Sequence, residues 1–446
     1  MQIQLSDHFT YKKLLRFTLP SIFMMVFVSI YSIVDGFFVS NFVGKTPFAA
    51  LNLIWPFVMI CGSLGFMIGT GGSALVGKTM GEGDLPRARA LFSLLIYVSL
   101  GFGVVIATVA FIFIRPIAVL LGATPDMLEY CVIYGRILLL AIPFFMLQNE
   151  FQSLLITAER PDFGLKITVA AGIANMIFDA LFVVVFRWGL AGAAAATALC
   201  QTVGGLVPLI YFILPNKSPL RLGKTRLDLR ALGKVFANGS SEFVTNISLS
   251  LVGMIYNLQL LKLVGEDGVS AYGVVIYVSF IFIAVFLGYT IGAAPIVSFH
   301  FGAGNTDELK NLRKKGLLLI ACFAAVLTAL GVGLAQPQAL IFVSYDKDLL
   351  EMTVRGVRLY SFSYLIVGFN IFGSSFFTAL NDGLTSATIS FVRTLVFQIA
   401  AVLLLPALLP ASMKLDGIWL AAVAAELLSL FITSFFLIRK RKKYHY

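Results

Sequence analysis

Long apolar stretches alternate with short polar segments along almost the whole chain, from residue 17 to residue 438. These stretches are about 23 to 31 residues long and carry few charges, whereas a helix needs about 20 apolar residues to cross a bilayer. Because backbone amides in lipid have to be satisfied within the segment, we expect each stretch to be a transmembrane helix. There are twelve, at about 17–39, 48–77, 90–114, 130–158, 163–186, 189–214, 235–261, 269–299, 316–343, 356–380, 384–409 and 415–438.

A basic segment, LPNKSPLRLGKTRLDLRALGK (214–234), separates the sixth stretch from the seventh. It divides the chain into an N-terminal lobe (1–214), a cytoplasmic linker (215–234) and a C-terminal lobe (235–446) of six spans each. The two halves repeat at an offset of 221 residues, which aligns MGEGDLPRARAL (80–91) with FGAGNTDELKNL (301–312). An even number of spans in each half makes the repeat parallel. We therefore predict an all-α membrane protein whose two pseudo-symmetric lobes surround a central cavity.

Composition and charge agree with an integral membrane protein. The chain is 59% hydrophobic and 12% charged, whereas soluble domains carry about 25% charged residues. Of the Lys and Arg residues, 23 lie on the side of the termini and six on the opposite side. The positive-inside rule then places both termini in the cytoplasm, with the protein in the inner or plasma membrane. This topology explains the net charge of +11 without nucleic-acid binding.

Other features argue against further sites. The first stretch is full length and lacks a small-residue cleavage motif, so we interpret it as a retained span and not as a cleaved signal peptide. The four cysteines lie far apart, which indicates neither disulfides nor a metal site. GSALVGKT (72–79) matches a phosphate-loop pattern but lies at the end of an apolar run with no soluble domain. We therefore expect no nucleotide binding.

Four polar residues in the N-terminal lobe form the main candidate site. Asp35 is the one charge in the first apolar stretch, where a carboxylate costs roughly 2.5–3.5 kcal/mol near the helix centre. Asn175 and Asp179 are four residues apart and share a helical face. By helix rise, Asp35, Asp179 and Thr197 lie about 6, 10 and 12 Å below the outer ends of their helices. Such oxygen ligands suit Na⁺, and two crowded carboxylates also suit a proton.

The C-terminal lobe does not repeat this site, since the offset places Tyr256 opposite Asp35. Glu242 and Asn246 share a face of the seventh stretch, and we weigh contact with substrate or cation against a structural role for Glu242.

Five further polar residues lie inside other spans. Arg393 and Glu426 have depths compatible with a structural ion pair, because unpaired charges in the membrane are rare. Gln148 and Glu150 could line the cavity or form its cytoplasmic gate. Asn370 is the remaining candidate for the cavity.

The chain resembles the multidrug and toxic compound extrusion (MATE) family over nearly its whole length. The resemblance rests on the two six-span lobes, Pro20 with Asp35, the segment VGKTMGEGD (76–84) and the pair Asn175 and Asp179. It implies a secondary antiporter that exports bulky, often cationic organic compounds, including antibiotics, against Na⁺ or H⁺. It also implies that Asp35, Asn175, Asp179 and Thr197 bind the coupling ion. The tenth span lacks the Asp on which some members rely.

The sequence therefore predicts a monomeric membrane transporter that is not an enzyme, with organic small molecules as cargo. Its only cofactor would be the coupling ion, H⁺ or Na⁺. A flippase for lipid-linked intermediates, with a similar two-lobe architecture, is the alternative, although intramembrane acids outnumber clear cavity bases and favour cationic cargo. An ATP-driven pump would need a nucleotide-binding domain, and a channel would not require the two-lobe repeat.

Overall fold

The computed structural model describes residues 3–344 and 346–446, and every regular element in those ranges is a helix. The N-terminal lobe contains α1 (Tyr11–Phe42), α2 (Lys45–Gly81), α3 (Leu85–Leu120), α4 (Pro125–Thr157), α5 (Pro161–Asp179) with the π-helix η1 (Ala180–Val185), and α6 (Gly189–Ile213). These elements confirm the six predicted spans of this lobe. GSALVGKT lies within α2, and a continuous helix cannot offer the converging loop amides of a phosphate site.

The C-terminal lobe departs from the predicted spans in two places. Its elements are α7 (Leu229–Val264), α8 (Glu266–Gly302), α9 (Thr306–Gly333), α10 (Ala335–Val343), α11 (Lys347–Ser361), α12 (Tyr364–Ala379), α13 (Gly383–Phe391) with the π-helix η2 (Val392–Phe397) and α14 (Gln398–Leu408), the 3-10 turn η3 (Ala411–Met413), α15 (Lys414–Arg439) and α16 (Arg441–Tyr444).

The ninth span is α9, which begins ten residues before the predicted stretch at 316–343 and leaves the last part of that stretch as the separate α10. The tenth is a pair, α11 and α12, bent by 46°. Hydropathy counts apolar residues and does not register such a break. The described residues thus hold eleven helices able to cross a membrane, or twelve if the bent pair is one span.

The internal repeat is visible in the turns between helices. Gly83 and Gly304, 221 residues apart, both have positive φ (84° and 67°), which glycine adopts without strain. The next residues, Asp84 and Asn305, accept hydrogen bonds from backbone amides of the first turns of α3 and α9. This is the usual role of Asp and Asn at a helix N-terminus. The aligned polar segments are therefore two copies of one helix–turn–helix connection.

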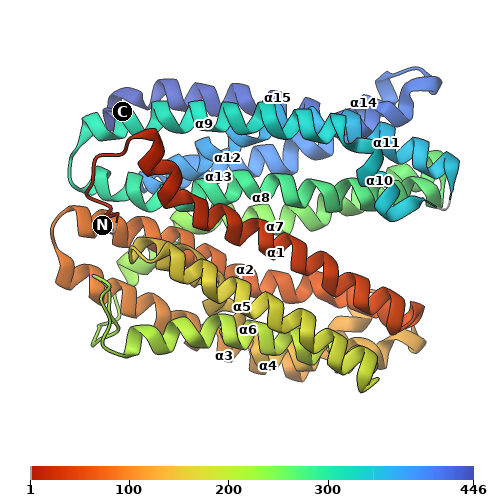
Figure 1. Cartoon of the computed structure of the whole chain (residues 1–446), viewed down its shortest axis with the longest axis horizontal. Coiled ribbons are helices and arrows are strands. Elements are labelled where there is room, and N and C mark those ends of the chain that lie inside the picture. The colour runs from red at the N-terminus through yellow and green to blue at the C-terminus, as the bar shows by residue number, and fades with distance from the viewer. Residues whose placement is uncertain (1–2, 345) are drawn as a thin grey trace.

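The two lobes lie side by side, with the N- and C-termini at the same end of the molecule (Figure 1). In the interface, α1 packs on α8 and its counterpart α7 packs on α2. Near the terminal end, α2 and α8 approach through a pair of glycines. A Cβ on Gly81 would lie 1.9 Å from the Phe299 carbonyl oxygen, and one on Gly302 would lie 2.0 Å from the Lys78 carbonyl oxygen. Only glycine permits this separation.

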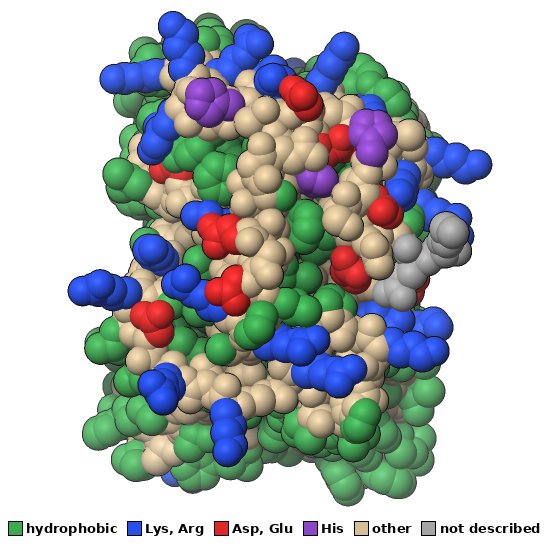
Figure 2. All heavy atoms as spheres, turned by 90° about the vertical axis from the view of Figure 1, so that its left-hand side faces the viewer, with side chains coloured by type: hydrophobic (Ala, Val, Ile, Leu, Met, Phe, Trp, Pro, Cys, Tyr) green, Lys and Arg blue, Asp and Glu red, His purple; other side chains and the backbone are tan. Residues whose placement is uncertain are grey.

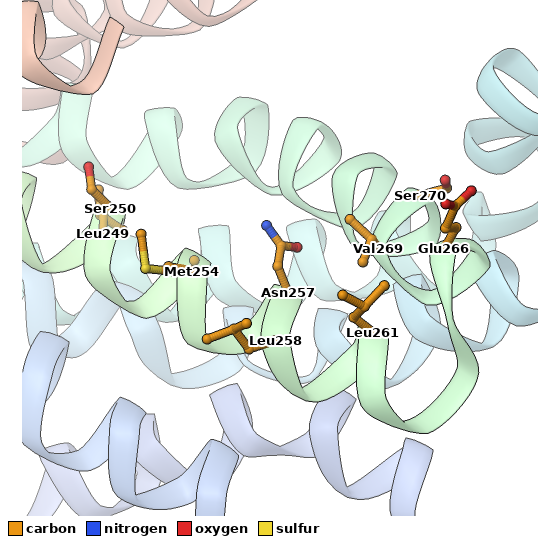
Figure 3. A pocket seen from close by; sticks show the side chains of 10 residues that line it. Leu249, Ser250, Met254, Asn257, Leu258, Leu261, Glu266, Val269 and Ser270 are labelled. Atoms are coloured by element: carbon orange, nitrogen blue, oxygen red, sulfur yellow. The ribbon is translucent and has the colours of Figure 1, made fainter. Parts of the chain in front are cut away.

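The helices of the two lobes diverge toward the other end of the molecule (Figure 1). There α7 and α8 line an open pocket of about 690 Å³. Figure 3 shows its side chains along α7, with Leu249, Met254, Asn257 and Leu261 among them, and Glu266 on α8. The two lobes therefore approach closely near the termini, and their helices diverge at the opposite end.

The terminal end is strongly basic, with Lys and Arg side chains spread across its face (Figure 2). The linker crosses this end without helical structure until α7 begins at Leu229, six residues before the predicted span. It is fastened to the N-terminal lobe: Ser218 Oγ donates to the Ala158 carbonyl (2.9 Å), and Arg89 Nε donates to the Pro219 carbonyl (2.8 Å).

The segment before α1, which we call the N-terminal strap (residues 3–9), contacts both lobes at this end. The Leu5 amide donates to Glu159 Oε1 at 2.8 Å, after the end of α4. The Phe9 amide donates to Glu308 Oε1 on α9 (2.9 Å), and His8 Nδ1 lies 2.6 Å from the other oxygen of Glu308. Lys315 Nζ donates to the Phe9 carbonyl at 2.6 Å.

The C-terminal segment is held by Asp382, which lies between α12 and α13. Its Oδ2 accepts hydrogen bonds from Lys440 Nζ (2.6 Å) and from the Tyr444 hydroxyl (2.8 Å). Burial alone would raise the pKa of the Asp382 carboxyl, but hydrogen bonds from Lys440, Tyr444 and Thr385 hold that pKa below its ordinary value of 3.8. The carboxylate therefore stays ionised and fixes this segment against the C-terminal lobe.

Candidate functional site

The four candidate residues of the N-terminal lobe come from three helices that pack together, α1, α5 and α6. Thr197 Oγ1 donates to Asp35 Oδ1 at 3.5 Å, and the carboxylates of Asp35 and Asp179 are close enough to interact. Asn175 and Asp179 are 2% and 0% exposed, whereas Asp35 is partly exposed. The prediction from depth along the helices thus identified two acids and a hydroxyl that lie close together in the structure. The amide of Asn175 lies one helical turn from Asp179.

Polar atoms in this cluster lack partners. Neither carboxylate oxygen of Asp179 accepts a hydrogen bond of good geometry from the described residues, and Nδ2 of Asn175 donates none to them. Buried polar atoms are normally satisfied, so each exception requires an explanation. Unsatisfied carboxylate oxygens are acceptors that a bound cation or a proton would satisfy.

Among the side chains that the structure describes, no cation interacts with these acids. The other titratable side chains that interact with Asp35 or Asp179 are Tyr31, Tyr134 and Cys200, all neutral in this environment. Two carboxylates side by side without a cation repel each other and are costly to bury. The described residues contain no cluster of three His, Cys, Asp or Glu. The site is therefore a pair of adjacent acids, both of which lie on membrane-spanning helices.

The helix carrying Asp179 changes its winding at that residue. The α-helix α5 ends at Asp179, and the π-helix η1 continues the span to Val185. Widened π turns are rare and often occur at functional sites. The sequence pattern gave no sign of this turn, since all of η1 is apolar. Tyr31 was also missed, although its place one helical turn before Asp35 could have indicated it.

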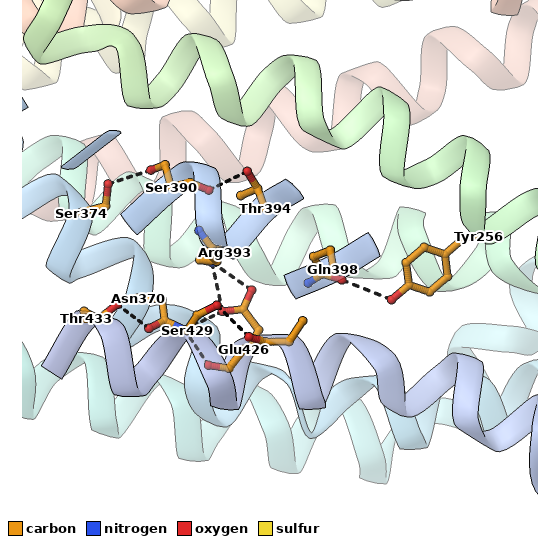
Figure 4. Close-up of polar contacts among 11 residues, drawn as sticks. Tyr256, Asn370, Ser374, Ser390, Arg393, Thr394, Gln398, Glu426, Ser429 and Thr433 are labelled. Carbon is orange, nitrogen blue, oxygen red and sulfur yellow. Dashed lines mark hydrogen bonds and ion pairs between the residues drawn. The ribbon is translucent and has the colours of Figure 1, made fainter. Parts of the chain in front are cut away.

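In the C-terminal lobe, two membrane charges are paired with each other. Arg393, which lies in η2, donates through Nε to both oxygens of Glu426 on α15, at 2.9 and 3.0 Å (Figure 4). Asn370 Nδ2 donates to Glu426 Oε2 at 2.7 Å, and Thr433 Oγ1 donates to Asn370 Oδ1 at 2.9 Å. The C-terminal lobe thus holds its buried acid against a fixed side-chain cation, whereas no described cation contacts Asp35 or Asp179. Asn370 is 0% exposed, so its amide serves this network and does not line an open surface.

The remaining candidates are placed as follows. Asn246 Nδ2 donates to the Glu242 carbonyl on α7 at 2.9 Å, and both residues are partly exposed. Gln148 and Glu150 on α4 are buried inside the N-terminal lobe. Gln148 packs against Gly204 of α6, while the backbone of Glu150 packs against Gly69 of α2. Their burial places them in the packing of the lobe and not on an open surface.

Comparison with known proteins gives a consistent result. The family model MatE matches residues 20–181 and again residues 243–404, one copy in each lobe. The multidrug export protein MepA of Staphylococcus haemolyticus is 23% identical over 369 residues, 80% of each chain. MepA of Staphylococcus aureus strain MSSA476 is 23% identical over 381 residues, which cover 84% of this chain and 82% of that protein.

Solved structures share the fold over almost the full length. A MATE crystal structure in complex with MaL6 superposes with a TM-score of 0.92 at 19% identity, covering 98% of both chains. An outward-facing structure of a multidrug resistance MATE family transporter superposes with a TM-score of 0.91 at 20% identity, covering 98% of this chain and 97% of that one. The two-lobe arrangement predicted from the sequence is confirmed.

Proposed function

Since the chain belongs to the MATE family of multidrug efflux transporters, we propose that it exports organic, mainly cationic compounds in exchange for H⁺ or Na⁺. The names of its relatives, multidrug export proteins, support this class of cargo. They give no support to the alternative, a flippase for lipid-linked intermediates.

The observation that carries the proposal is the pair Asp35 and Asp179, two interacting acids on two packed membrane spans with no cation beside them among the described side chains. In our proposal they bind the coupling ion, and Asn175 and Thr197 complete the site. The Oδ atom of Asn175 and the hydroxyl of Thr197 add neutral oxygens of the kind that Na⁺ prefers. The same pair can hold a single proton between its carboxylates.

The coupling follows from the position of the site. We propose that the termini lie in the cytoplasm, in agreement with the basic face at that end. The end at which the helices of the two lobes diverge then faces outward. Ion and cargo each shift the equilibrium between outward- and inward-open states by their different affinities for the two states. Because Asp35 is partly exposed, a bound cation would neutralise it and weaken its attraction for cationic cargo.

The test is efflux from proteoliposomes with the H⁺ and Na⁺ gradients imposed separately. We expect Asp35→Asn and Asp179→Asn each to abolish gradient-driven efflux of an organic cation. Asp162→Asn is the matched control, because this exposed acid begins the same helix that ends at Asp179. Efflux that survives in both site variants would refute the assignment, and the gradient that drives the wild type identifies the ion.

A further inference from the structure

A second pocket lies at the terminal end of the molecule, where the N-terminal strap continues into α1. Its volume of about 630 Å³ falls in the range of about 300–1,000 Å³ that is typical of sites for small ligands. Its lining comes from two segments, Ile3, Gln4 and Asp7 of the strap and four residues at the start of α1. Because hydrogen bonds to Glu159 and Glu308 hold the strap in place, the pocket is part of the folded structure.

The part of this pocket that α1 lines is basic, and most of its charge is unpaired. Lys12, Lys13 and Arg16 all contribute to the lining. Lys13 Nζ pairs with Asp7 Oδ2 at 2.7 Å, whereas Lys12 and Arg16 are exposed and bond to no described residue. The helix α1 also begins here, capped by Thr10, so the positive end of its dipole adds to the two cations. The pocket therefore offers two free side-chain cations to an anionic group.

Lys12 and Arg16 share a face of α1 with exposed apolar residues farther along the same helix. Leu19 and Phe23 follow at helical spacing and are 41% and 58% exposed. Arg16 directly precedes the apolar stretch 17–39, and basic side chains at the end of a span reach the level of the lipid headgroups. This face of α1 thus combines two cations at headgroup level with an apolar surface for lipid chains.

We propose that this pocket binds the headgroup of an anionic phospholipid, whose phosphate pairs with Lys12 and Arg16 and whose acyl chains lie along the exposed apolar face of α1. Basic clusters beside a membrane span and basic pockets at its end are features that recognise such lipids. A soluble phosphate compound would meet the same cations but make no use of the apolar face. The site is separate from Asp35 and Asp179, so its test requires neither cargo nor a coupling ion.

The experiment is native mass spectrometry of the purified full-length protein at low ionic strength, titrated with phosphatidylglycerol or with phosphatidylcholine of the same acyl chains. One surface cation changes the affinity for an anionic lipid by roughly fivefold. We expect K12Q/R16Q to weaken binding of phosphatidylglycerol at least tenfold and to leave phosphatidylcholine within twofold of wild type. The matched control is K224Q/R226Q, which removes one exposed Lys and one exposed Arg of the linker outside the pocket, and should stay within twofold.

Equal losses in K12Q/R16Q and K224Q/R226Q would overturn the site, because net charge alone would then explain the binding. Competition with glycerol 3-phosphate identifies the occupant. We expect millimolar concentrations to displace no lipid, and displacement would show that the pocket takes a soluble phosphate compound instead.

A second variant predicts a change of opposite sign. Asp7→Asn removes the one acid that lines the pocket and releases Lys13 from its ion pair. The amide oxygen of the new side chain can still accept the hydrogen bond that the Gln4 amide donates to Asp7 Oδ2 at 3.0 Å. We expect Asp7→Asn to bind phosphatidylglycerol at least threefold more tightly than wild type. Damage to the strap would weaken binding, so an unchanged or weaker affinity contradicts the proposal.

Discussion

The ion pair between Arg393 and Glu426 can be tested by breaking it in two ways. Glu426→Leu removes the carboxylate and leaves Arg393 as an uncompensated charge in a site where its side chain is 11% exposed. It also removes the acceptor of the hydrogen bond from Asn370. The double variant R393M/E426L removes both charges and fills the space with apolar side chains of similar size.

The structure sets the size of the effect. Glu426 is 3% exposed and accepts three short charge-assisted hydrogen bonds, at 2.7, 2.9 and 3.0 Å. Removing one partner of such a buried pair costs about 3–5 kcal/mol, whereas replacing both with apolar residues is often neutral or stabilising. At roughly 2 °C per kcal/mol, we expect Glu426→Leu to lower the unfolding midpoint by about 6–10 °C and R393M/E426L to restore most of it.

Thermal unfolding in detergent, followed by loss of the monodisperse peak in size-exclusion chromatography, measures both effects. Asp307→Asn serves as the control, because its ion pair with Lys310 is exposed and we expect no measurable change on its loss. If Glu426→Leu leaves the midpoint unchanged, the pair does not carry a buried charge. If the double variant is as unstable as the single one, the loss comes from packing and the electrostatic explanation is wrong.

Two further predictions concern the terminal end of the molecule. Because its pKa is lowered in the folded protein, Asp382 stabilises the C-terminal segment fully above about pH 4 and loses this effect as the pH falls further. Asp382→Asn should therefore increase hydrogen exchange in residues 440–446 at pH 7 and remove the acid-dependent increase that we expect in wild type. Gly81→Leu should force α2 away from α8, since its Cβ would overlap the Phe299 carbonyl. Spin-label distances between the lobes should lengthen at this end, whereas Gly101→Leu, with open space around it, should leave them unchanged.

Much of the fold followed from the length of the apolar stretches, because the bilayer fixes how long an uncharged helix has to be. Gly83 and Gly304 also indicated the repeat. They occupy the same place in the two aligned segments, where the positive φ favours glycine. The break between α11 and α12 did not follow, because the residues at the break, Phe362 and Ser363, fit a continuous helix as well as a bent one.

Contacts in the candidate site could be predicted from the sequence only where the depth of a residue along its helix is enough to place it. Depth along the helices brought Asp35 and Thr197 to within hydrogen-bond distance. Depth alone does not predict that the side chain of Asn370 points inward to Glu426. The rotation of a helix about its axis depends on how it packs against its neighbours. The same limit applies to Glu150, which is 0% exposed and lies where the backbone of α4 approaches α2 at Gly69.

The N-terminal strap has a practical consequence for labelling this protein. Leu5 is bonded to the end of α4 and Phe9 to α9, so the chain ahead of α1 belongs to neither lobe alone. The C-terminal segment is bonded to Asp382 and therefore belongs to one lobe. A rigid fusion partner for electron microscopy would report the orientation of a single lobe from the C-terminal segment. At the strap, the same fusion would compete with both anchors and disturb the state that it is meant to show.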